Sequence, residues 1–394
     1  MSRKVLLALV GACVLGLGLP VAAQAATWSV VASTNPTQND ALSAVARVPN
    51  TTQFWAVGSA TNTAGVSQPT IVRTTGSGWS VTASPTIPGG GVLLDVAALN
   101  TTNAWAVGYR GTADDASDEC LEYGGCPITG TPVVEHWNGK AWQVVALPGG
   151  NAALDGVKVF SASDVLAVGV TQSGSAVAYH WNGSAWSTST LPLPASCAGS
   201  PSIAAAVAAL PGSSTTRFAV GECNTAIVWK LAGNTWSVAW NGYAEELSDI
   251  TPVSAKSIWA VGTVGSSALL VHWNGKTWSS APVPTDLSDD IWLAGVIRVP
   301  GTQTLWAVGG VISDPDFPVA AYYNGSTWSR VDVPGWLWGD LFSVAASSAT
   351  NLYAVGGNWD VEGSTYQTGD AGCTVPTDPN GDGCPATTLI ERYH

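Results

Sequence analysis

The stretch Ala104-Trp105-Ala106-Val107-Gly108-Tyr109 decides how this chain folds, because its centre recurs along the sequence. The tripeptide Ala-Val-Gly appears seven times, each time directly behind a bulky apolar residue: Trp55, Trp105, Leu166, Phe218, Trp259, Trp306 and Tyr353. These residues are 50, 61, 52, 41, 47 and 47 positions apart. Periods of this length are typical of solenoids, propellers and arrays, in which each repeat is one supersecondary unit.

Each repeat predicts four short strands, which in the second repeat cover residues 94–99, 104–109, 133–137 and 141–147. Asn138-Gly139 joins the last two, and such a pair supplies the positive φ angles of a tight hairpin turn. The same turn recurs at Asn182-Gly183, Asn274-Gly275 and Asn324-Gly325, and in weaker form at Gly78 and Gly233. Six fourth strands then open on a tryptophan: Trp79, Trp142, Trp186, Trp236, Trp278 and Trp328.

The seventh repeat lacks its fourth strand at the C-terminal end, where residues 389–394 match the third strand of the second repeat. The missing strand is found at the other end, because residues 26–31 match residues 140–145. A ring that closes by pairing its two ends explains this division and removes exposed strand edges. We therefore predict an all-β chain with one domain, residues 26–394, that forms a seven-bladed β-propeller of four-stranded blades closed by pairing of the N-terminal strand with the C-terminal blade.

Residues 1–25 contain two basic residues, an apolar run and Ala23-Gln24-Ala25, which predict a secretory signal peptide. A membrane anchor or a lipoprotein modified at Cys13 are the alternatives, but the apolar run is shorter than the ~18 residues of a spanning helix. Loss of Arg3 and Lys4 would move the formal net charge from −13 to −15. We expect a secreted or cell-surface protein, and nucleic acid is not an expected partner.

Six cysteines follow the signal peptide and fall into three near pairs, none with the spacing of a zinc site. In an oxidising compartment they predict three local disulfides: Cys120 with Cys126, Cys197 with Cys223 and Cys373 with Cys384.

The second and third strands resemble those of kelch propellers at Gly309-Gly310 and Gly356-Gly357, and at the aromatic positions Tyr322, Tyr323 and Trp328. Gly275-Lys276-Thr277-Trp278 also looks like the end of the Asp-box turn of sialidases, without the Ser and Asp of that box. The chain thus resembles secreted bacterial kelch-like or Asp-box-like seven-bladed propellers.

Three of the four histidines, His136, His180 and His272, occupy one repeat position, where other repeats have Arg73, Lys230, Tyr322 and Arg392. A position filled by any long side chain with a polar tip predicts packing or hydrogen bonding between blades. His394 ends the chain. A Ser/His/Asp triad and a histidine-based metal site would therefore lack their main base or ligand.

In a propeller, the connections between strands two and three, and between strand four and the next strand one, emerge on the same face. Here these connections hold all the long insertions and most of the 27 acidic residues. Loops on a rigid scaffold commonly carry function, and a negative face attracts cations. The alternative is that acidic loops only keep the protein dispersed in water.

Five tryptophans outside the repeat pattern, Trp240, Trp292, Trp336, Trp338 and Trp359, are predicted on the same loops. Indoles beside carboxylates suit neutral sugars, although the same side chains could pack beneath the loops. The predicted ligand-binding residues are these tryptophans with Glu245, Glu246, Asp289, Asp290 and Asp340.

Asp378, Asn380 and Asp382 place oxygen ligands at alternate positions around glycines, like the first half of an EF-hand loop. Leu389 replaces the final glutamate, so the pattern leaves two alternatives open: a shorter calcium loop, or an Asx turn between Cys373 and Cys384.

Three functional hypotheses follow. The first is a monomeric, non-catalytic propeller that binds an extracellular carbohydrate or protein. The second is a glycoside hydrolase or lyase that uses two carboxyl groups of the same loops, one with a raised pKa. The third is a structural or interaction scaffold.

Overall fold

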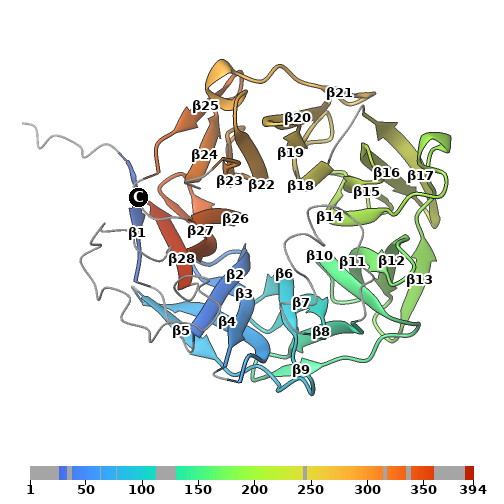
Figure 1. Ribbon diagram of the computed structural model, residues 1–394, viewed down its shortest axis with the longest axis vertical. Helices are drawn as coiled ribbons and strands as arrows, with labels where there is room; N and C mark the ends of the chain where they lie inside the picture. The colour runs from blue at the N-terminus through green and yellow to red at the C-terminus, as the bar shows by residue number, and fades with distance from the viewer. Residues whose placement is uncertain are drawn as a thin grey trace, which may run out of the picture.

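The computed structural model describes residues 26–32, 38–62, 64–76, 78–111, 130–242, 246–313, 317–333, 339–358 and 387–394. In these residues, seven four-stranded antiparallel sheets stand around a central axis as the blades of a propeller (Figure 1). The described helical structure consists of two short 3-10 helices, η2 (Ala195–Cys197) and η3 (Thr285–Leu287). The predicted all-β seven-bladed fold is confirmed. No helix in the described ranges is long and apolar enough to cross a membrane.

The first four blades follow the chain in order, each from its inner to its outer strand. Blade 1 is β2 (Gln38–Arg47), β3 (Phe54–Thr61), β4 (Ser67–Thr75) and β5 (Gly78–Thr82). Blade 2 is β6 (Val92–Asn100), β7 (Asn103–Tyr109), β8 (Pro132–Trp137) and β9 (Trp142–Val144). Blade 3 is β10 (Ala152–Ser161), β11 (Asp164–Thr171), β12 (Ala176–Trp181) and β13 (Trp186–Thr190). Blade 4 is β14 (Ile203–Ala209), β15 (Thr216–Glu222), β16 (Ala226–Ala232) and β17 (Thr235–Asn241).

The last three blades complete the ring, and the seventh takes strands from both ends of the chain. Blade 5 is β18 (Glu246–Ser254), β19 (Ser257–Val264), β20 (Ser267–Trp273) and β21 (Trp278–Ser280). Blade 6 is β22 (Ile291–Arg298), β23 (Leu305–Val311), β24 (Pro318–Tyr323) and β25 (Trp328–Val331). Blade 7 is β26 (Gly339–Ser348), β27 (Asn351–Asn358), β28 (Thr387–Tyr393) and β1 (Trp28–Val30).

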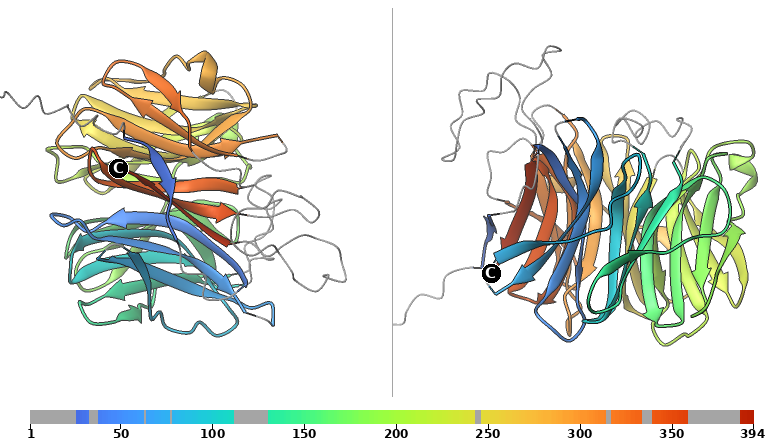
Figure 2. Two further views of the ribbon diagram at one scale, coloured as in Figure 1. Left: turned by 90° about the vertical axis from the view of Figure 1, so that its left-hand side faces the viewer. Right: turned by 90° about the horizontal axis from the view of Figure 1, so that it is seen from below.

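The two ends of the chain close the ring as the sequence predicts. Trp28, Ser29 and Val30 pair in register with Tyr393, Arg392 and Glu391 of β28. The backbone N–H of Thr27 donates to the carbonyl of His394 at 3.1 Å, and His394 donates back to Thr27 at 3.2 Å. Figure 2 shows β1 lying along β28 at the outside of blade 7.

The hydrophobic core is divided among the seven interfaces between neighbouring blades. Each interface contains a large cluster of buried apolar side chains, for example between blades 1 and 2 and between blades 6 and 7. The recurring tryptophans build these clusters, because the tryptophan of an outer strand packs against the bulky residue of the preceding blade. Trp142 meets Trp55 edge to face at 5.3 Å, and Trp186 meets Trp105 at 5.4 Å. The bulky residue before each Ala-Val-Gly and the tryptophan that opens the fourth strand of the next blade are therefore the two partners of one repeated contact.

Ring closure uses the same aromatic contact. Trp28 of β1 meets Trp306 of blade 6 at 5.4 Å with the rings at 88°. Such edge-to-face pairs contribute about 0.5–1.5 kcal/mol beyond the area that they bury. The N-terminal strand is thus held by the same contact that holds the other outer strands.

The glycine of each Ala-Val-Gly repeat lies where the second strand touches the inner strand. Every inner strand has a β-bulge directly after the residue opposite this glycine, as at Leu247 opposite Gly262. A Cβ atom on any of the seven glycines would overlap a backbone carbonyl oxygen of the inner strand. Bulges bend a strand and increase its twist, so the inner strand presses its backbone against the second strand at this point. Only glycine fits there.

The Asn-Gly turns differ from the predicted hairpin. Trp137 pairs with Trp142, so four residues connect these strands, and only the glycine has a positive φ, 91° at Gly139. The side chain of Asn138 instead accepts hydrogen bonds from the backbone N–H groups of Lys140 and Ala141 at 3.0 and 3.1 Å. The prediction of positive φ at both residues is wrong, because the asparagine acts as a side-chain cap of the turn.

Candidate functional site

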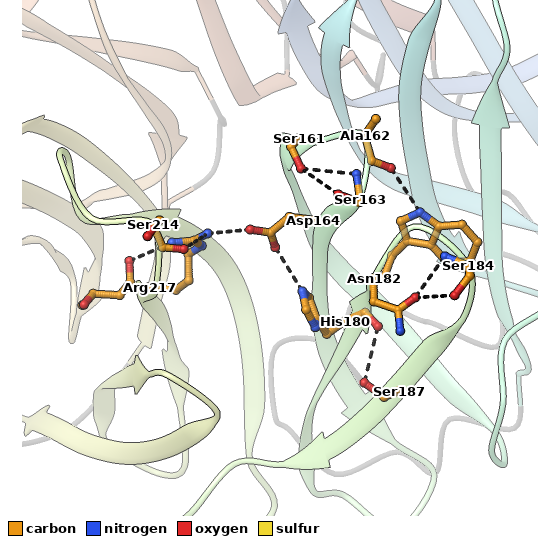
Figure 3. A network of polar contacts seen from close by, with 12 residues as sticks. Ser161, Ala162, Ser163, Asp164, His180, Asn182, Ser184, Ser187, Ser214 and Arg217 are labelled. Atoms are coloured by element: carbon orange, nitrogen blue, oxygen red, sulfur yellow. Dashed lines mark hydrogen bonds and ion pairs between the residues drawn. The ribbon is translucent and has the colours of Figure 1, made fainter.

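The three histidines of the repeat position contact side chains of their own blades, although packing or hydrogen bonding between blades was predicted. The Nε2 atom of His180 lies 3.0 Å from Oδ1 of Asp164, and Arg217 of blade 4 donates to Oδ2 of the same carboxylate at 2.7 Å (Figure 3). Arg217 is buried and also donates to the backbone carbonyl of Ser214 at 2.9 Å. The network therefore joins blades 3 and 4.

Two other histidines stack on the bulky residue of their own blade. The rings of His136 and Trp105 are 4.3 Å apart, as are those of His272 and Trp259. Burial lowers the pKa of both imidazoles, which favours the neutral form. Ser257 and Nε2 of His272 are hydrogen-bonded at 3.0 Å. These histidines stabilise their blades.

The loop-bearing face is the face where the connections between strands two and three, and from strand four to the next blade, emerge. Seven of the acidic side chains predicted there belong to described residues, and all seven lie in these connections or at strand ends beside them: Asp40, Glu222, Glu246, Asp286, Asp289, Asp290 and Asp340. The ion pairs of Asp164 with His180 and Arg217 lie at the turn between β10 and β11, on the opposite face. Among the described residues, negative charge gathers on the loop-bearing face.

At the inner rim of this face, seven equivalent residue pairs join the start of an inner strand to the end of a second strand. The pairs are Ala41 with Ser59, Val92 with Tyr109, Ala153 with Val170, Ile203 with Glu222, Glu246 with Thr263, Trp292 with Gly310 and Asp340 with Gly357. The inner strands surround the axis, so these pairs form one circle (Figure 1).

One arc of the inner rim is apolar and closed. Val92, Tyr109, Ala153 and Val170 of blades 2 and 3 are buried in a small cluster of their own. The half-buried Ile203 packs against the cluster. This arc offers little surface to a ligand.

The adjoining arc, on blades 4 and 5, is acidic and half-exposed. Glu222 of blade 4 and Glu246 of blade 5 are both half-buried. Burial, and to a lesser extent the charge of Glu246, raise the pKa of Glu222 to about 7. The carboxylates of Glu222 and Glu246, on neighbouring blades, thus repel one another. A cation placed between them would remove that repulsion.

The predicted ligand-binding tryptophans are placed differently from the expectation where they are described. Trp240 and Trp292 lie in strands β17 and β22, and not in loops, near the ends of these strands on the loop-bearing face. Trp240 packs against the core between blades 4 and 5. Trp292 packs against Phe342 of blade 7 at 6.1 Å. Trp336, Trp338 and Trp359 lie outside the described residues.

The predicted carboxylate acceptors are spread over the face. Asp289 is exposed and Asp290 half-buried in the connection before β22, where Asp290 accepts a hydrogen bond from Ser313. Asp340 is buried against Gly310. Glu246 reaches the acidic arc, and Glu245 lies outside the described residues. The structure thus brings Glu246 together with Glu222, which was not among the predicted binding residues.

One predicted disulfide is confirmed. Cys197 and Cys223 are joined, with their Cα atoms 5.7 Å apart, and both are buried. The bridge ties η2, between blades 3 and 4, to the residue after Glu222. It therefore fixes the connection beside the acidic arc. Cys120, Cys126, Cys373 and Cys384 lie outside the described residues, as do Asp378, Asn380 and Asp382 of the predicted calcium loop.

Replacing both Cys197 and Cys223 by alanine is expected to lower the free energy of unfolding by about 3 kcal/mol. The bridge closes a loop with a sequence separation of 26, and cross-links of this size restrict the unfolded chain by roughly that amount. Urea unfolding of the double variant measures the loss. An unchanged midpoint under oxidising conditions would mean that the bridge contributes nothing to stability.

Three half-buried aspartates on the inner strands were not predicted. Asp95 accepts backbone hydrogen bonds from Val96 and from Val157 of the next blade, both at 2.7 Å. Asp249 accepts the same pair of bonds from Ile250 and Val296. These carboxyl groups join the bulge of one inner strand to the bulge of the next. The sequence could have indicated these residues, because each is an aspartate among the apolar residues of an inner strand.

Burial raises the pKa of Asp95 and Asp155 to about 7 and that of Asp249 to about 6. The backbone hydrogen bonds and Lys158 lower the pKa values of Asp95 and Asp249, but not enough to offset burial.

Within the described ranges, no group of three or more His, Cys, Asp or Glu side chains has the arrangement of a metal site.

No protein-family model matches the sequence, and no curated protein matches it. Solved structures share its fold. The structure titled YCF48 bound to D1 peptide is 15% identical, covers 93% of this chain and 96% of its own, and has a TM-score of 0.54. The structure of U3-55K is 14% identical, with coverages of 93% and 98% and a TM-score of 0.56. The RRP9 WD40 repeats give the same values. At these identities the likeness extends to the propeller fold alone.

Proposed function

We propose that this chain is a secreted, non-catalytic propeller that binds a basic protein or peptide segment at the acidic arc of the loop-bearing face. The observation that carries the proposal is the pair of half-buried glutamates Glu222 and Glu246 on neighbouring blades: burial and then the charge of Glu246 together raise the pKa of Glu222 to about 7. A lysine or arginine side chain between the two carboxylates would be favoured by both charges.

Several further features support a protein ligand over a sugar. The two described tryptophans of the predicted sugar site pack against core or neighbouring-blade side chains. The chain has 27 acidic and 14 basic residues, so long-range attraction acts on cationic partners. YCF48, whose structure has a similar fold, is bound to D1 peptide in that structure. Secretion, an extracellular partner and a monomeric state belong to the same proposal and rest on the sequence of residues 1–25 and on the cysteines.

Glu222→Gln or Glu246→Gln is expected to weaken binding of a fluorescein-labelled octalysine peptide about tenfold, since one charged contact at a half-buried site contributes on the order of 1.4 kcal/mol. Binding by the wild-type protein should strengthen as pH rises through about 7, where Glu222 ionises. Fluorescence anisotropy at low salt measures both effects.

The matched control is Asp332→Asn, which removes the same charge at an exposed position beyond β25. Equal losses in Asp332→Asn and Glu222→Gln would mean that only net charge matters and would refute the acidic arc as the site. Retention of neutral glycans on a glycan array, without peptide binding, would favour the carbohydrate hypothesis. Parallel runs with calcium and with a chelator test the loop at Asp378, Asn380 and Asp382.

A further inference from the structure

Glu391 is a fully buried carboxyl group on the strand that receives the N-terminus. Its exposed fraction is 0%, and neither carboxylate oxygen has a hydrogen-bond partner. Buried carboxyl groups without partners are rare, because the charged form loses its hydration without compensation. Burial therefore favours the neutral form of the group.

The closing strand β1 forms part of the cover over this carboxyl group. Glu391 pairs in register with Val30 of β1 and with Ala354 of β27. Side chains alternate along a strand, so Glu391 points to the same side as Leu389 and Tyr393, into the cluster between blades 6 and 7. Trp28 of β1 belongs to this cluster and packs against Tyr393 at 5.5 Å. Detachment of β1 would open the site to water.

No charged neighbour compensates the buried group. The charged side chains on the elements packed around it are Arg298 of β22, Arg330 of β25, Asp340 of β26 and Arg392 of β28, and none of them contributes to its pKa. The titratable side chains of the cluster itself are the phenols of Tyr322 and Tyr393. Burial alone raises the pKa of Glu391 to about 8.

We infer that ring closure is coupled to the protonation of Glu391: the pairing of β1 with β28 is most stable while Glu391 is protonated. Opening exposes the carboxyl group to water, where its pKa returns to the ordinary value of 4.5. Between about pH 5 and pH 8, opening therefore releases one proton, and the opening constant rises about tenfold per pH unit. Above pH 8 both states are ionised and the constant levels off. The pairing of β1 with β28 is therefore more stable at mildly acidic pH than at mildly alkaline pH.

The molecule contains its own control at the equivalent position of blade 2. Glu135 is also fully buried, and it pairs with Val144 of β9 as Glu391 pairs with Val30. Its Oε1 atom accepts a hydrogen bond from Ser84 at 2.8 Å. The strand that covers it is joined to β8 by a four-residue turn and cannot diffuse away.

Hydrogen exchange of the full chain, followed by mass spectrometry from pH 5 to pH 9 and divided by intrinsic rates, tests the inference. Peptides covering residues 26–32 and 387–394 should show an opening constant that rises about tenfold per pH unit up to pH 8. A peptide from β11 (Asp164–Thr171) reports opening of the whole molecule and serves as the reference. In Glu391→Gln the constant should not change with pH, whereas Glu135→Gln should keep the wild-type slope at the termini.

A wild-type opening constant that does not vary with pH would overturn the inference. So would an unchanged slope in Glu391→Gln, or loss of the slope in Glu135→Gln. If Glu391→Gln does not fold, Glu391→Leu removes the titrating group without leaving an unpaired amide, and the same pH-independent exchange is expected.

Discussion

Gly262→Ala is expected to lower the free energy of unfolding by about 3 kcal/mol or more, although it adds only one methyl group. The Cβ atom would overlap the backbone carbonyl oxygen of Glu246 and crowd the Cα atom of Leu247. Overpacking in a core costs about 1–3 kcal/mol when side chains can move, and here the obstacle is backbone. The inner strand would have to shift away at its bulge. Urea unfolding followed by tryptophan fluorescence measures the effect.

Gly150→Ala is the matched control. A Cβ atom at Gly150 would meet nothing within 4 Å, and its φ is not positive, so the same methyl group should leave the unfolding midpoint unchanged or raise it slightly. Similar midpoints for Gly262→Ala and Gly150→Ala would contradict the explanation of the Ala-Val-Gly repeat. The other six repeat glycines should behave like Gly262, since each faces an inner-strand carbonyl.

Stability is expected to fall as pH rises from about 5 to 8. Burial raises the pKa of six carboxyl groups to between about 6 and about 8: Asp95, Glu135, Asp155, Glu222, Asp249 and Glu391. Unfolding returns them to ordinary values near 4, so the unfolded chain binds fewer protons in this range. The free energy of unfolding therefore decreases with pH, by up to about 1.4 kcal/mol per pH unit for each group. We expect the melting temperature to fall continuously over this interval.

Asp155→Asn should remove the contribution of one of these six carboxyl groups, so the free energy of unfolding should decrease less steeply with pH. The Oδ2 atom of Asp155 is buried without a hydrogen-bond partner, and burial is the sole cause of its raised pKa. Asp332→Asn, at an exposed position, should leave the slope as it is in the wild-type protein. Melting curves between pH 5 and pH 8 distinguish the two variants. A melting temperature that rises over this interval would show that these carboxyl groups are ionised in the folded state.

The sequence determined the fold almost completely, because the main contacts of the fold are repeated from blade to blade. The bulky residue before Ala-Val-Gly and the tryptophan after the turn touch in successive blades, so their spacing gave the number of blades and the strand order. The match of residues 26–31 to an outer strand gave the closure that pairs Trp28 with Tyr393. The Cys197 to Cys223 bridge could be predicted because its partners are near neighbours among the cysteines.

The tertiary structure alone decided which polar groups meet and which are buried. Glu222 and Glu246 approach one another because adjacent blades bring their inner edges together at the axis, a geometry that sequence spacing does not contain. Trp292 looked like a loop residue, and the extension of β22 placed it against Phe342. Glu391 read as a polar residue near the end of the chain, yet the returning N-terminal strand covers it. Repeated local contacts can be read from a linear pattern, whereas the burial of a single charge depends on how the whole ring closes around it.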